Sequence, residues 1–392
     1  MTQPAETTAP APLLFTPAHE ALRAETRAWG DTFAEGYVER ALSLDFFWDL
    51  YRETGARGYL GMTVPKADGG LEASAVEAGI VIEEVSRADF NLGFALFGAY
   101  SANQLLSMFA TPAMKEQWLA PALRGEQAIG FALTEPGAGS DSRNIQTRAT
   151  KVDGGWRITG QKASSGFTVV AGATIVWTRT SDDPRRGITP FLVPLDSPGV
   201  ARERIPNHGF RPTGRGMIGL EDVFVAEEQM LGEVGEGFTK IANSFDFTRG
   251  MIALEATGAA DRAIAQTIAY VSERETFGDV LASRQGVTFP IAEHATRIEA
   301  ARLLAYSVLA KADAGQPYTK EASMAKWFAT EAATNAVRDM IVLHGYRGYS
   351  DELPLMQLMR DLQGLEIAEG ATQIQKLIIS RELFGRASGG RR

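Results

Sequence analysis

The sequence predicts an α+β fold in which a β-sheet domain separates two helical domains. Apolar residues recur at helical spacing in residues 17–126 and again in residues 237–385. Residues 127–236 instead contain short alternating or β-branched runs that are bounded by turn residues. Helices and strands in separate blocks of a chain are typical of α+β proteins, whereas a doubly wound parallel sheet would alternate them. We expect residues 1–16 to form a disordered N-terminal tail and residues 386–392 to form a C-terminal tail.

Turn residues mark the boundaries within each block. The stretch "TVPKADGG" (Thr63–Gly70) contains a proline and a glycine pair that must interrupt the first helical block. In the middle block "DGG" (Asp153–Gly155) precedes "WRITG", and the candidate strands "ATIVWTRT", "ITPFLVPL" and "IGLEDVFV" follow. The last block begins after "GEGF" (Gly235–Phe238) and includes a long helical pattern over Glu321–Leu343.

Composition excludes several classes of function. The 392 residues include 39 basic and 48 acidic ones, for a net charge of −9, so we expect no nucleic-acid partner. There is no cysteine, and the four histidines show no metal-ligand spacing, so we expect no metal site. The first residues lack the features of a signal peptide, and the longest apolar stretch, around Phe167–Trp177, is too short to cross a bilayer. We therefore expect a cytoplasmic protein without a membrane partner.

Common catalytic and nucleotide-binding motifs are absent. No G-x-S-x-G nucleophile elbow occurs. The string "GAGSDS" lacks the third glycine of a dinucleotide-binding loop, and "GWRITGQK" lacks the Gly-Lys-Ser/Thr ending of a P-loop. The commonest hydrolase signature is therefore missing, and the Rossmann and Walker interpretations both fail.

One carboxylate stands alone among apolar neighbours in "LEIAEGATQIQKLI" (Leu365–Ile378). Thr372 and Gln375 have the spacing of a capping box, which predicts a helix that begins at Thr372 and places Glu369 on the preceding turn. A carboxylate that loses hydration has a raised pKa and becomes a better proton acceptor. From these residues alone, an ordinary surface glutamate before a helix cap remains an open alternative.

A second candidate is the glycine-containing stretch "FALTEPGAGSDSRN" (Phe131–Asn144). Pro136 and two glycines predict a tight turn whose backbone amides can approach a flat or anionic ligand. A purely structural turn would have the same residues. Further strings elsewhere in the chain favour one of these two interpretations.

Several strings together resemble the acyl-CoA dehydrogenase flavoproteins. "TEPGAGSD" is similar to that family's signature, and "EGATQIQKLIISRE", from Glu369 on, is similar to its E-G-T-x-Q-I-Q segment. "SFDFTRG" (Ser244–Gly250), "RETFG" (Arg274–Gly278) and "PLMQLMRD" (Pro354–Asp361) follow in register. The resemblance covers about Phe15 to Gly385. It implies a C-terminal four-helix bundle, bound FAD and a homotetramer built as a dimer of dimers.

The resemblance also implies a reaction. An acyl thioester is oxidised to the 2-enoyl thioester, with Glu369 as the general base for the α-proton and hydride transfer to flavin N5. The backbone amide of Glu369 would then bind the thioester oxygen, where negative charge develops. Other members carry the base immediately before the arginine of "TRG", but that position is Thr248 here. Glu369 is therefore the candidate base.

The same resemblance assigns binding residues. Phe131, Leu133, Thr134 and Ser140 would line the flavin or the thioester, and Arg274, Phe277 and Gln285 would reach the FAD of a neighbouring subunit. The implied cofactor-binding set is Phe131, Leu133, Thr134, Ser140, Ser164, Gly166, Arg274, Thr276, Phe277, Gln285, Val342, Gly345, Tyr346, Ala371, Thr372 and Gln373. The implied substrate-binding set is Ser140, Asp246, Arg249, Gly370 and Arg381. Taken alone, Arg274 and Phe277 could simply end a helix before a Gly278 cap.

The chain departs from the family pattern at the cofactor positions. Ser164 and Gly166 stand where an aromatic residue and a threonine are common, so one wall of the flavin site is expected to be smaller. Val342 and Tyr346 replace a glutamine and a glycine, so the contacts on the adenine side are expected to differ.

Two further departures concern the acyl group. Ala368 precedes the base where a tyrosine is frequent, which leads to the hypothesis of a branched, cyclic or otherwise bulky acyl group. Glu255 lies on the substrate helix where small residues are usual. It could favour a polar acyl tail, or it could be a solvated or packed-away glutamate.

Partners and alternatives follow from the same resemblance. The expected substrate is a thioester of CoA or of an acyl-carrier protein, and the expected electron acceptor is an electron-transferring flavoprotein. Two alternatives remain open: a flavin-dependent monooxygenase or oxidase on the same fold, and a non-catalytic acyl-thioester binding protein.

Overall fold

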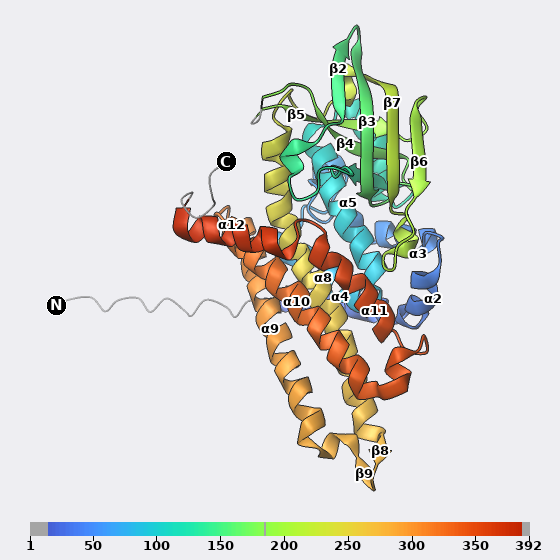
Figure 1. The fold of residues 1–392 in the computed structure, drawn as a ribbon, viewed down its shortest axis with the longest axis vertical. Coiled ribbons are helices and arrows are strands. Elements are labelled where there is room, and N and C mark those ends of the chain that lie inside the picture. Colours follow the sequence, from blue (N-terminus) through green and yellow to red (C-terminus); the bar gives the residue numbers. More distant parts are fainter. Residues whose placement is uncertain (1–14, 184–185, 386–392) are drawn as a thin grey trace, which may run out of the picture.

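The computed structural model describes residues 15–183 and 186–385, and it confirms the α+β fold. A helical part, a curled sheet and a second helical part follow one another along the chain. The sheet lies at one end of an elongated molecule, and the long C-terminal helices run from it to the other end (Figure 1). Most residues of the two predicted tails, 1–14 and 386–392, lie outside the described residues.

The first helical part is built from helices with clear N-terminal caps. The Thr16 side chain accepts from the His19 amide, Ser74 and Glu77 form a capping box, and Asp89 accepts from two amides of the next helix. These caps begin α1, α4 and α5 respectively. The helices are α1 (Pro17–Asp31), α2 (Tyr37–Leu42), α3 (Trp48–Ala56), α4 (Ala75–Ala88), α5 (Phe90–Phe109), α6 (Pro112–Met114) and α7 (Ala120–Leu123).

The middle part is a seven-stranded mixed sheet. Its strands are β1 (Ile129–Ala132), β2 (Arg148–Val152), β3 (Gly155–Ser165), β4 (Ala173–Arg179), β5 (Ile188–Pro194), β6 (Val200–Arg204) and β7 (Gly216–Ala226). The order is β1-β4-β2-β3-β7-β6, and β5 pairs with β4. The register between β3 and β7 shifts between Lys162 and Ser165, so the end of β3 is irregular where Ser164 lies.

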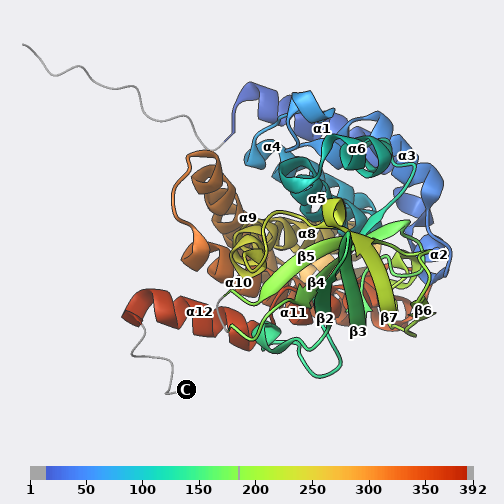
Figure 2. The same cartoon turned by 90° about the horizontal axis from the view of Figure 1, so that it is seen from above.

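The second helical part contains α8 (Gly237–Glu273), α9 (Gln285–Asp313), α10 (Thr319–His344), α11 (Leu355–Ile367) and α12 (Thr372–Phe384). Helices α8, α9 and α10 pack against one another, α11 packs on α10, and α4 of the first part packs on α8. Seen from above, α1 and α4 lie on one side of α8, and α11 and α12 lie on the other (Figure 2). The helical segment predicted over Glu321–Leu343 is confirmed as α10.

A two-stranded hairpin, β8 (Glu275–Thr276) and β9 (Asp279–Val280), connects α8 to α9. Phe277 and Gly278 form its turn, with φ of +52° and +81°. Two consecutive residues of positive φ are typical of a tight hairpin turn. The alternative in which Gly278 caps a helix is therefore wrong, because α8 already ends at Glu273.

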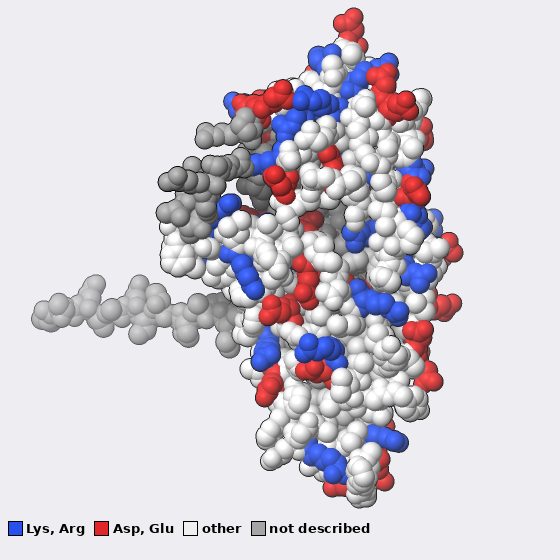
Figure 3. Space-filling view, in the orientation of Figure 1, with Lys and Arg blue, Asp and Glu red and all other residues white. Residues whose placement is uncertain are grey.

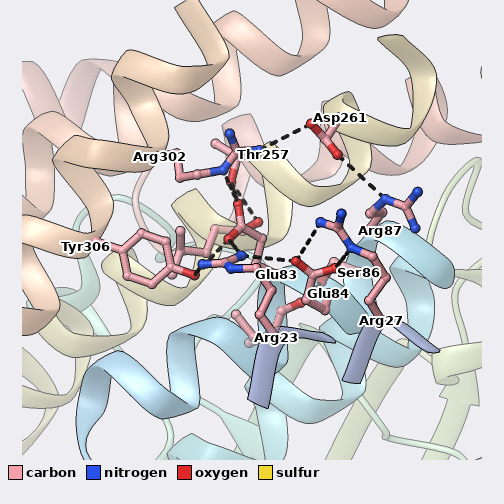
Figure 4. Close-up of polar contacts among 12 residues, drawn as sticks. Arg23, Arg27, Glu83, Glu84, Ser86, Arg87, Thr257, Asp261, Arg302 and Tyr306 are labelled. Carbon is pink, nitrogen blue, oxygen red and sulfur yellow. Dashed lines mark hydrogen bonds and ion pairs between the residues drawn. The ribbon is translucent and has the colours of Figure 1, made fainter. Parts of the chain in front are cut away.

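Buried ion pairs join the two helical parts (Figure 4). Glu83, on α4, accepts from Arg302 at 2.6 Å and from Arg23 at 2.8 Å, and the Tyr306 hydroxyl donates to it at 2.7 Å. Burial alone would raise the pKa of Glu83, but the two guanidinium groups hold it below its ordinary value. Because these partners come from α1 and α9, the cluster fixes the N-terminal helices against the C-terminal ones.

The surface carries charged side chains of both signs. Acidic and basic side chains are interspersed over the face in Figure 3, without a continuous basic band. Among the described helices, none has the length and apolar character needed to cross a membrane. Among residues 15–183 and 186–385, no group of three or more potential metal ligands was found.

Candidate active site

Glu369 lies on the turn between α11 and α12, at the end of the helical part that faces the sheet (Figure 1). Helix α12 begins at Thr372, as predicted. The predicted capping box is wrong, because Ala371 is the N-cap and Thr372 is already helical. Gln375 donates instead to the carbonyl oxygens of Glu369 at 3.0 Å and of Gly370 at 2.8 Å. The glutamine therefore stabilises the turn that carries the carboxylate.

The Glu369 side chain is half-buried, and one of its carboxylate oxygens is desolvated. Its Oε2 atom has almost no accessible surface and no hydrogen-bond partner. Burial raises the pKa of Glu369 to about 7, although Arg249, Lys326 and a hydrogen bond with Thr248 act in the opposite direction. A group with this pKa exchanges its proton near neutral pH, which is what a general base requires. The alternative of an ordinary surface glutamate does not describe this side chain.

Helix α8 supplies the side chains that face this turn. Arg249 is 6% exposed, and its Nη1 donates to Asp246 at 2.7 Å. Asp246 also accepts from the Thr319 hydroxyl, which ties α8 to the start of α10. The Nε atom of Arg249 is buried without a partner. The structure therefore places Arg249 and its partner Asp246 close to the turn of Glu369 and Gly370.

Arg381 is not part of this group. It is exposed on the last turn of α12, nine residues after the helix begins. At 1.5 Å per residue this places it about 14 Å along the helix from Thr372. Of the predicted cofactor residues, Ala371, Thr372 and Gln373 follow the turn directly, and the side of α12 that bears Gln373 is exposed.

Sequence reasoning missed Lys326 and gave Gln375 the wrong role, although both residues support the turn. Lys326 is 0% exposed, and its Nζ donates to the Gly370 carbonyl at 2.8 Å. A signal was present in the sequence, because Lys326 lies at helical spacing from Ala322, Ala329 and Ala333, all of which are buried. A lysine on an otherwise apolar helix stripe indicates a buried cation that needs a partner.

The "TEPGAGSD" loop is held by a buried ion pair that sequence reasoning also missed. Nζ of Lys162, on β3, donates to Glu135 at 2.7 Å and to the Leu133 carbonyl at 3.0 Å. Glu135 also accepts from the amide of Thr147 at 2.9 Å. Burial raises the pKa of Glu135, but Lys162 and the backbone amides hold it below its ordinary value. The glutamate of the motif is therefore an anchor of the loop.

Several residues of this loop are open to solvent. Phe131 is half-buried and packs against Trp177 at 5.4 Å between ring centroids, while Leu133 is buried. Thr134 and Ser140 are exposed, and a Cβ at Gly137 or Gly139 would meet nothing within 4 Å. These observations fit the flavin of FAD lying against this loop.

Ser164 and Gly166, which stand at the expected flavin wall, lie at the end of β3 beside this loop. Ser164 is exposed in the left-handed region, with φ of +60°, and its side chain contacts Arg215. A Cβ at Gly166 would have Phe94 as its neighbour at 3.7 Å. These two positions leave a shallow surface at the end of β3 that can contact a planar group.

The remaining predicted cofactor residues lie at the opposite end of the molecule. Thr248 and Arg274 are 26 residues apart, with all the residues between them in α8, so they are separated by about 39 Å. Phe277 is 97% exposed, Tyr346 81% and Val342 73%. Together with Arg274, Thr276, Gln285 and Gly345, these residues cannot share one site with Glu369 of the same chain.

Glu255 is packed away inside the protein. It is 0% exposed, and both carboxylate oxygens lack a hydrogen-bond partner. Burial raises its pKa well above the ordinary value, and Asp361 adds to this effect. The solvated alternative is therefore wrong. Glu255 lies seven residues after Thr248, on the same face of α8 and about 10 Å further along its axis.

Comparison with known proteins agrees with this geometry. The family models of the acyl-CoA dehydrogenase N-terminal, middle and C-terminal domains match residues 16–126, 130–223 and 235–384. The chain is 32% identical to a 3-(aryl)acrylate reductase from Clostridium sporogenes over 95% of its own length and 100% of that protein. It is 33% identical to the caffeyl-CoA reductase-Etf complex subunit CarC from Acetobacterium woodii, over 83% of this chain and 87% of that one.

Among solved structures, a glutaryl-CoA dehydrogenase from Mycobacterium smegmatis in complex with FADH2 superposes with a TM-score of 0.89. It is 25% identical, over 96% of this chain and 97% of that one. Three consecutive family domains and a matching fold leave one assignment. The chain belongs to the acyl-CoA dehydrogenase family and is an FAD-dependent oxidoreductase.

Proposed function

We propose that this enzyme interconverts an acyl thioester and its 2-enoyl thioester, with Glu369 as the general base. The observation that carries the proposal is the half-buried Glu369 carboxylate on a turn that faces α8. Its Oε2 atom is inaccessible and has no partner, and its pKa is raised to about 7. A solvated glutamate would be a far weaker base for a carbon acid. The thioester would lie between this turn and the "TEPGAGSD" loop.

The proposed reaction removes one proton and one hydride from the acyl group. Glu369 takes the proton from the α-carbon, the electron pair of that C–H bond forms the new double bond, and the β-hydrogen leaves with its own pair. Bound FAD supplies the hydride acceptor, at N5 of the flavin. In the opposite direction protonated Glu369 returns the proton to the α-carbon. The same residues therefore serve a dehydrogenase or a reductase, which matters because two of the relatives are named as reductases.

Charge that develops on the thioester oxygen needs a donor. Within the described part of the chain, the backbone amide of Glu369 makes no hydrogen bond. The left-handed conformation of Glu369 separates this amide from the ladders of α11 and α12. The free amide supports our assignment of Glu369 as both base and oxyanion donor. Asp246 and Arg249 would bind the thioester or its carrier nearby.

A second copy of the chain would complete the cofactor site. Phe277, Val342 and Tyr346 are apolar or aromatic and strongly exposed in one chain, which supports a contact between subunits. We propose a homotetramer in which these residues, with Arg274 and Gln285, reach the FAD of a neighbouring subunit. A cytoplasmic location, a CoA or acyl-carrier-protein thioester and an electron-transferring flavoprotein as partner belong to the same proposal.

The most specific part of this proposal concerns the acyl group. Ala368, beside the base, has a side chain of one carbon and leaves volume next to the reacting carbons. We propose a branched, cyclic or otherwise bulky acyl group. A preference for a polar tail would follow if Glu255 contacts the acyl chain.

The test is anaerobic mixing of the purified flavoprotein with a panel of thioesters on CoA and on an acyl-carrier protein. We expect the oxidised flavin absorbance to bleach with at least one saturated thioester, and the 2-enoyl product to form when a dye accepts the electrons. Bleaching by none of the thioesters, together with substrate consumption that needs oxygen and a separate reductant, would favour a monooxygenase and refute the proposal. Bleaching followed by rapid reoxidation with oxygen would favour an oxidase.

A further inference from the structure

The turn that carries Glu369 has a backbone conformation that needs support. Glu369 and Gly370 both lie in the left-handed region, with φ of +54° and +88°. A residue with a side chain rarely keeps that conformation unless the surrounding contacts hold it. At Gly370 a Cβ would lie 2.8 Å from Nε2 of Gln375, so the turn also packs closely against α12. The groups that hold this turn therefore decide where the carboxylate points.

Two buried side chains hold it from two different helices. Nζ of Lys326, on α10, donates to the Gly370 carbonyl at 2.8 Å and lies 3.5 Å from the Glu366 carbonyl. Nε2 of Gln375, on α12, donates to the carbonyls of Glu369 and Gly370. Both side chains belong to residues that are 0% exposed. The Gly370 carbonyl is thus shared by two donors, one of which is a cation.

Charged groups from three helices face the turn: Arg249 from α8, Lys326 from α10 and Glu366 from α11. The guanidinium of Arg249 is paired with Asp246 at 2.7 Å. Lys326, by contrast, forms no salt bridge within the described residues. Burial lowers the pKa of Lys326 to about 8, and the carboxylate of Glu369 opposes that change. At neutral pH Lys326 is therefore largely protonated and balances the charge of Glu369.

We propose that Lys326 is the positioning residue of Glu369, which fixes the Gly370 carbonyl and stabilises the deprotonated base by its charge. The proposal rests on the proposed function, because it identifies what supports the base of that reaction. Lys326 acts through the turn and the carboxylate and does not contact the reacting carbons. Gln375 supplies the uncharged half of the same clamp.

Three variants separate the two roles. Lys326→Met removes the donor and the charge, Lys326→Gln removes the charge but keeps an N–H donor, and Gln375→Met removes the other donor but leaves the charge. Lys376→Met is the matched control, because Lys376 lies on α12 close to the turn but is exposed. A solvated charge has a weak, screened effect on a buried group.

Two measurements read the roles independently. The first measurement is the pH dependence of kcat. Its acidic limb gives the apparent pKa of Glu369, and its plateau value shows how well the deprotonated carboxylate is positioned. Infrared titration of the carboxyl band that Glu369→Gln removes gives the pKa of Glu369 without turnover. The band remains measurable if no thioester is converted, so failure of the proposed function and failure of this proposal are distinguishable.

We expect Lys326→Met to raise the apparent pKa of Glu369 by about one unit or more and to lower the plateau of kcat about tenfold. KM should stay within about twofold of the wild-type value, since Lys326 does not bind substrate. Lys326→Gln should raise the pKa of Glu369 but lower the plateau of kcat less than Lys326→Met does. Gln375→Met should lower the plateau of kcat without raising the pKa of Glu369. If Lys326→Met does not fold, Lys326→Gln decides the question.

The contrary result is equally definite. If the folded Lys326 variants keep the pKa of the Glu369 band and the plateau of kcat at the values of Lys376→Met, the assignment is overturned. A rise in KM without a change in pKa or kcat would also overturn it, because it would place Lys326 in substrate binding.

Discussion

Glu369 combines two conditions that oppose each other. Burial makes its carboxylate reactive, and the neighbouring cations keep it ionisable near pH 7. Because the carboxylate must be deprotonated to accept a proton, the rate of α-proton removal should rise as pH increases through about 7. We therefore expect the pKa of this side chain to set the acidic limb of the pH profile for thioester oxidation.

Glu369→Gln tests the role of this carboxylate directly. We expect kcat to fall by about 10²–10⁴, because an amide cannot accept the α-proton, while FAD stays bound. Stopped-flow bleaching under anaerobic conditions and the flavin content of the purified variant measure the two effects. Glu382→Gln, an exposed glutamate on α12, is the control. Wild-type bleaching rates in Glu369→Gln would remove the assignment.

Glu135→Gln tests the anchor of the flavin-side loop. The substitution leaves the Lys162 ammonium buried without its carboxylate, which typically costs about 3–5 kcal/mol. We expect a lower free energy of unfolding and loss of FAD on gel filtration. The double variant Glu135→Gln/Lys162→Met should recover part of the stability, since no buried charge remains. A single variant with unchanged stability and flavin content would show that the pair does not anchor the loop.

Among the helices, α8 carries both Arg249, which lies close to Glu369, and an unexplained buried acid, Glu255. Glu255 keeps a raised pKa because of burial, so the folded state binds its proton more tightly than the unfolded state does. The contribution of Glu255 to stability is then fully present at pH values below its unfolded pKa, and it is lost as pH rises towards the folded pKa.

Glu255→Leu should therefore stabilise the protein, by about 1–3 kcal/mol for removal of buried polar atoms that lack partners. The gain should be larger at pH 8 than at pH 5. Thermal unfolding at both pH values measures it, with the exposed Glu273 changed to leucine as the control. Equal or lower stability at pH 8 would show that Glu255 has a partner in the protein. A simultaneous change in acyl preference would place it in the substrate pocket.

The two groups of predicted cofactor residues lie at opposite ends of α8. This separation is useful only if another chain brings its own far end to the flavin. The exposed aromatic side chains at the β8–β9 hairpin and after α10 are consistent with such a contact. Assembly and cofactor retention would then be coupled, because loss of the subunit contact would also remove part of the FAD site.

Phe277→Asp tests this coupling. Phe277 is 97% exposed in one chain, so we expect little change in the folding of the monomer. A charge at a subunit contact should shift the molecule to a smaller species and lower its FAD content. Light scattering and flavin absorbance measure both, with Met108→Asp as the control at another exposed apolar position. An unchanged assembly with full FAD content would exclude Phe277 from the contact.

Local sequence pattern was sufficient for the order of helical and strand blocks and for several individual elements. Helical spacing predicted α10, and turn residues marked the ends of several strands. The isolated charge among apolar residues drew attention to Glu369 but left a surface glutamate as an open alternative. The capping box at Thr372 failed because spacing alone does not say which residue is the cap. Gln375 has the side chain of a capping residue, but the left-handed turn at Glu369 and Gly370 presents carbonyl oxygens to it, and an amide N–H binds those instead.

Motifs that resemble the family predicted more than local pattern did, because they assigned roles to residues from Phe131 to Arg381. They identified Glu369, Asp246 and Arg249, which the fold brings together. They did not identify Lys162 or Lys326, because nothing in a linear string shows that a lysine on one element lies against a carbonyl on another. Glu135 was recognised as part of a motif, but its partner lies 27 residues away on β3.

The order of helices and strands, the family and the candidate base follow from the amino-acid sequence, because they depend on periodicity, on turn residues and on short motifs that are contiguous in the chain. The tertiary structure decided the surroundings of the base: which cations face it, which donors hold its turn and how far α8 carries the second group of cofactor residues. Burial and charge act through space, so the pKa of Glu369 depends on residues that lie more than 40 and more than 100 positions before it in the chain.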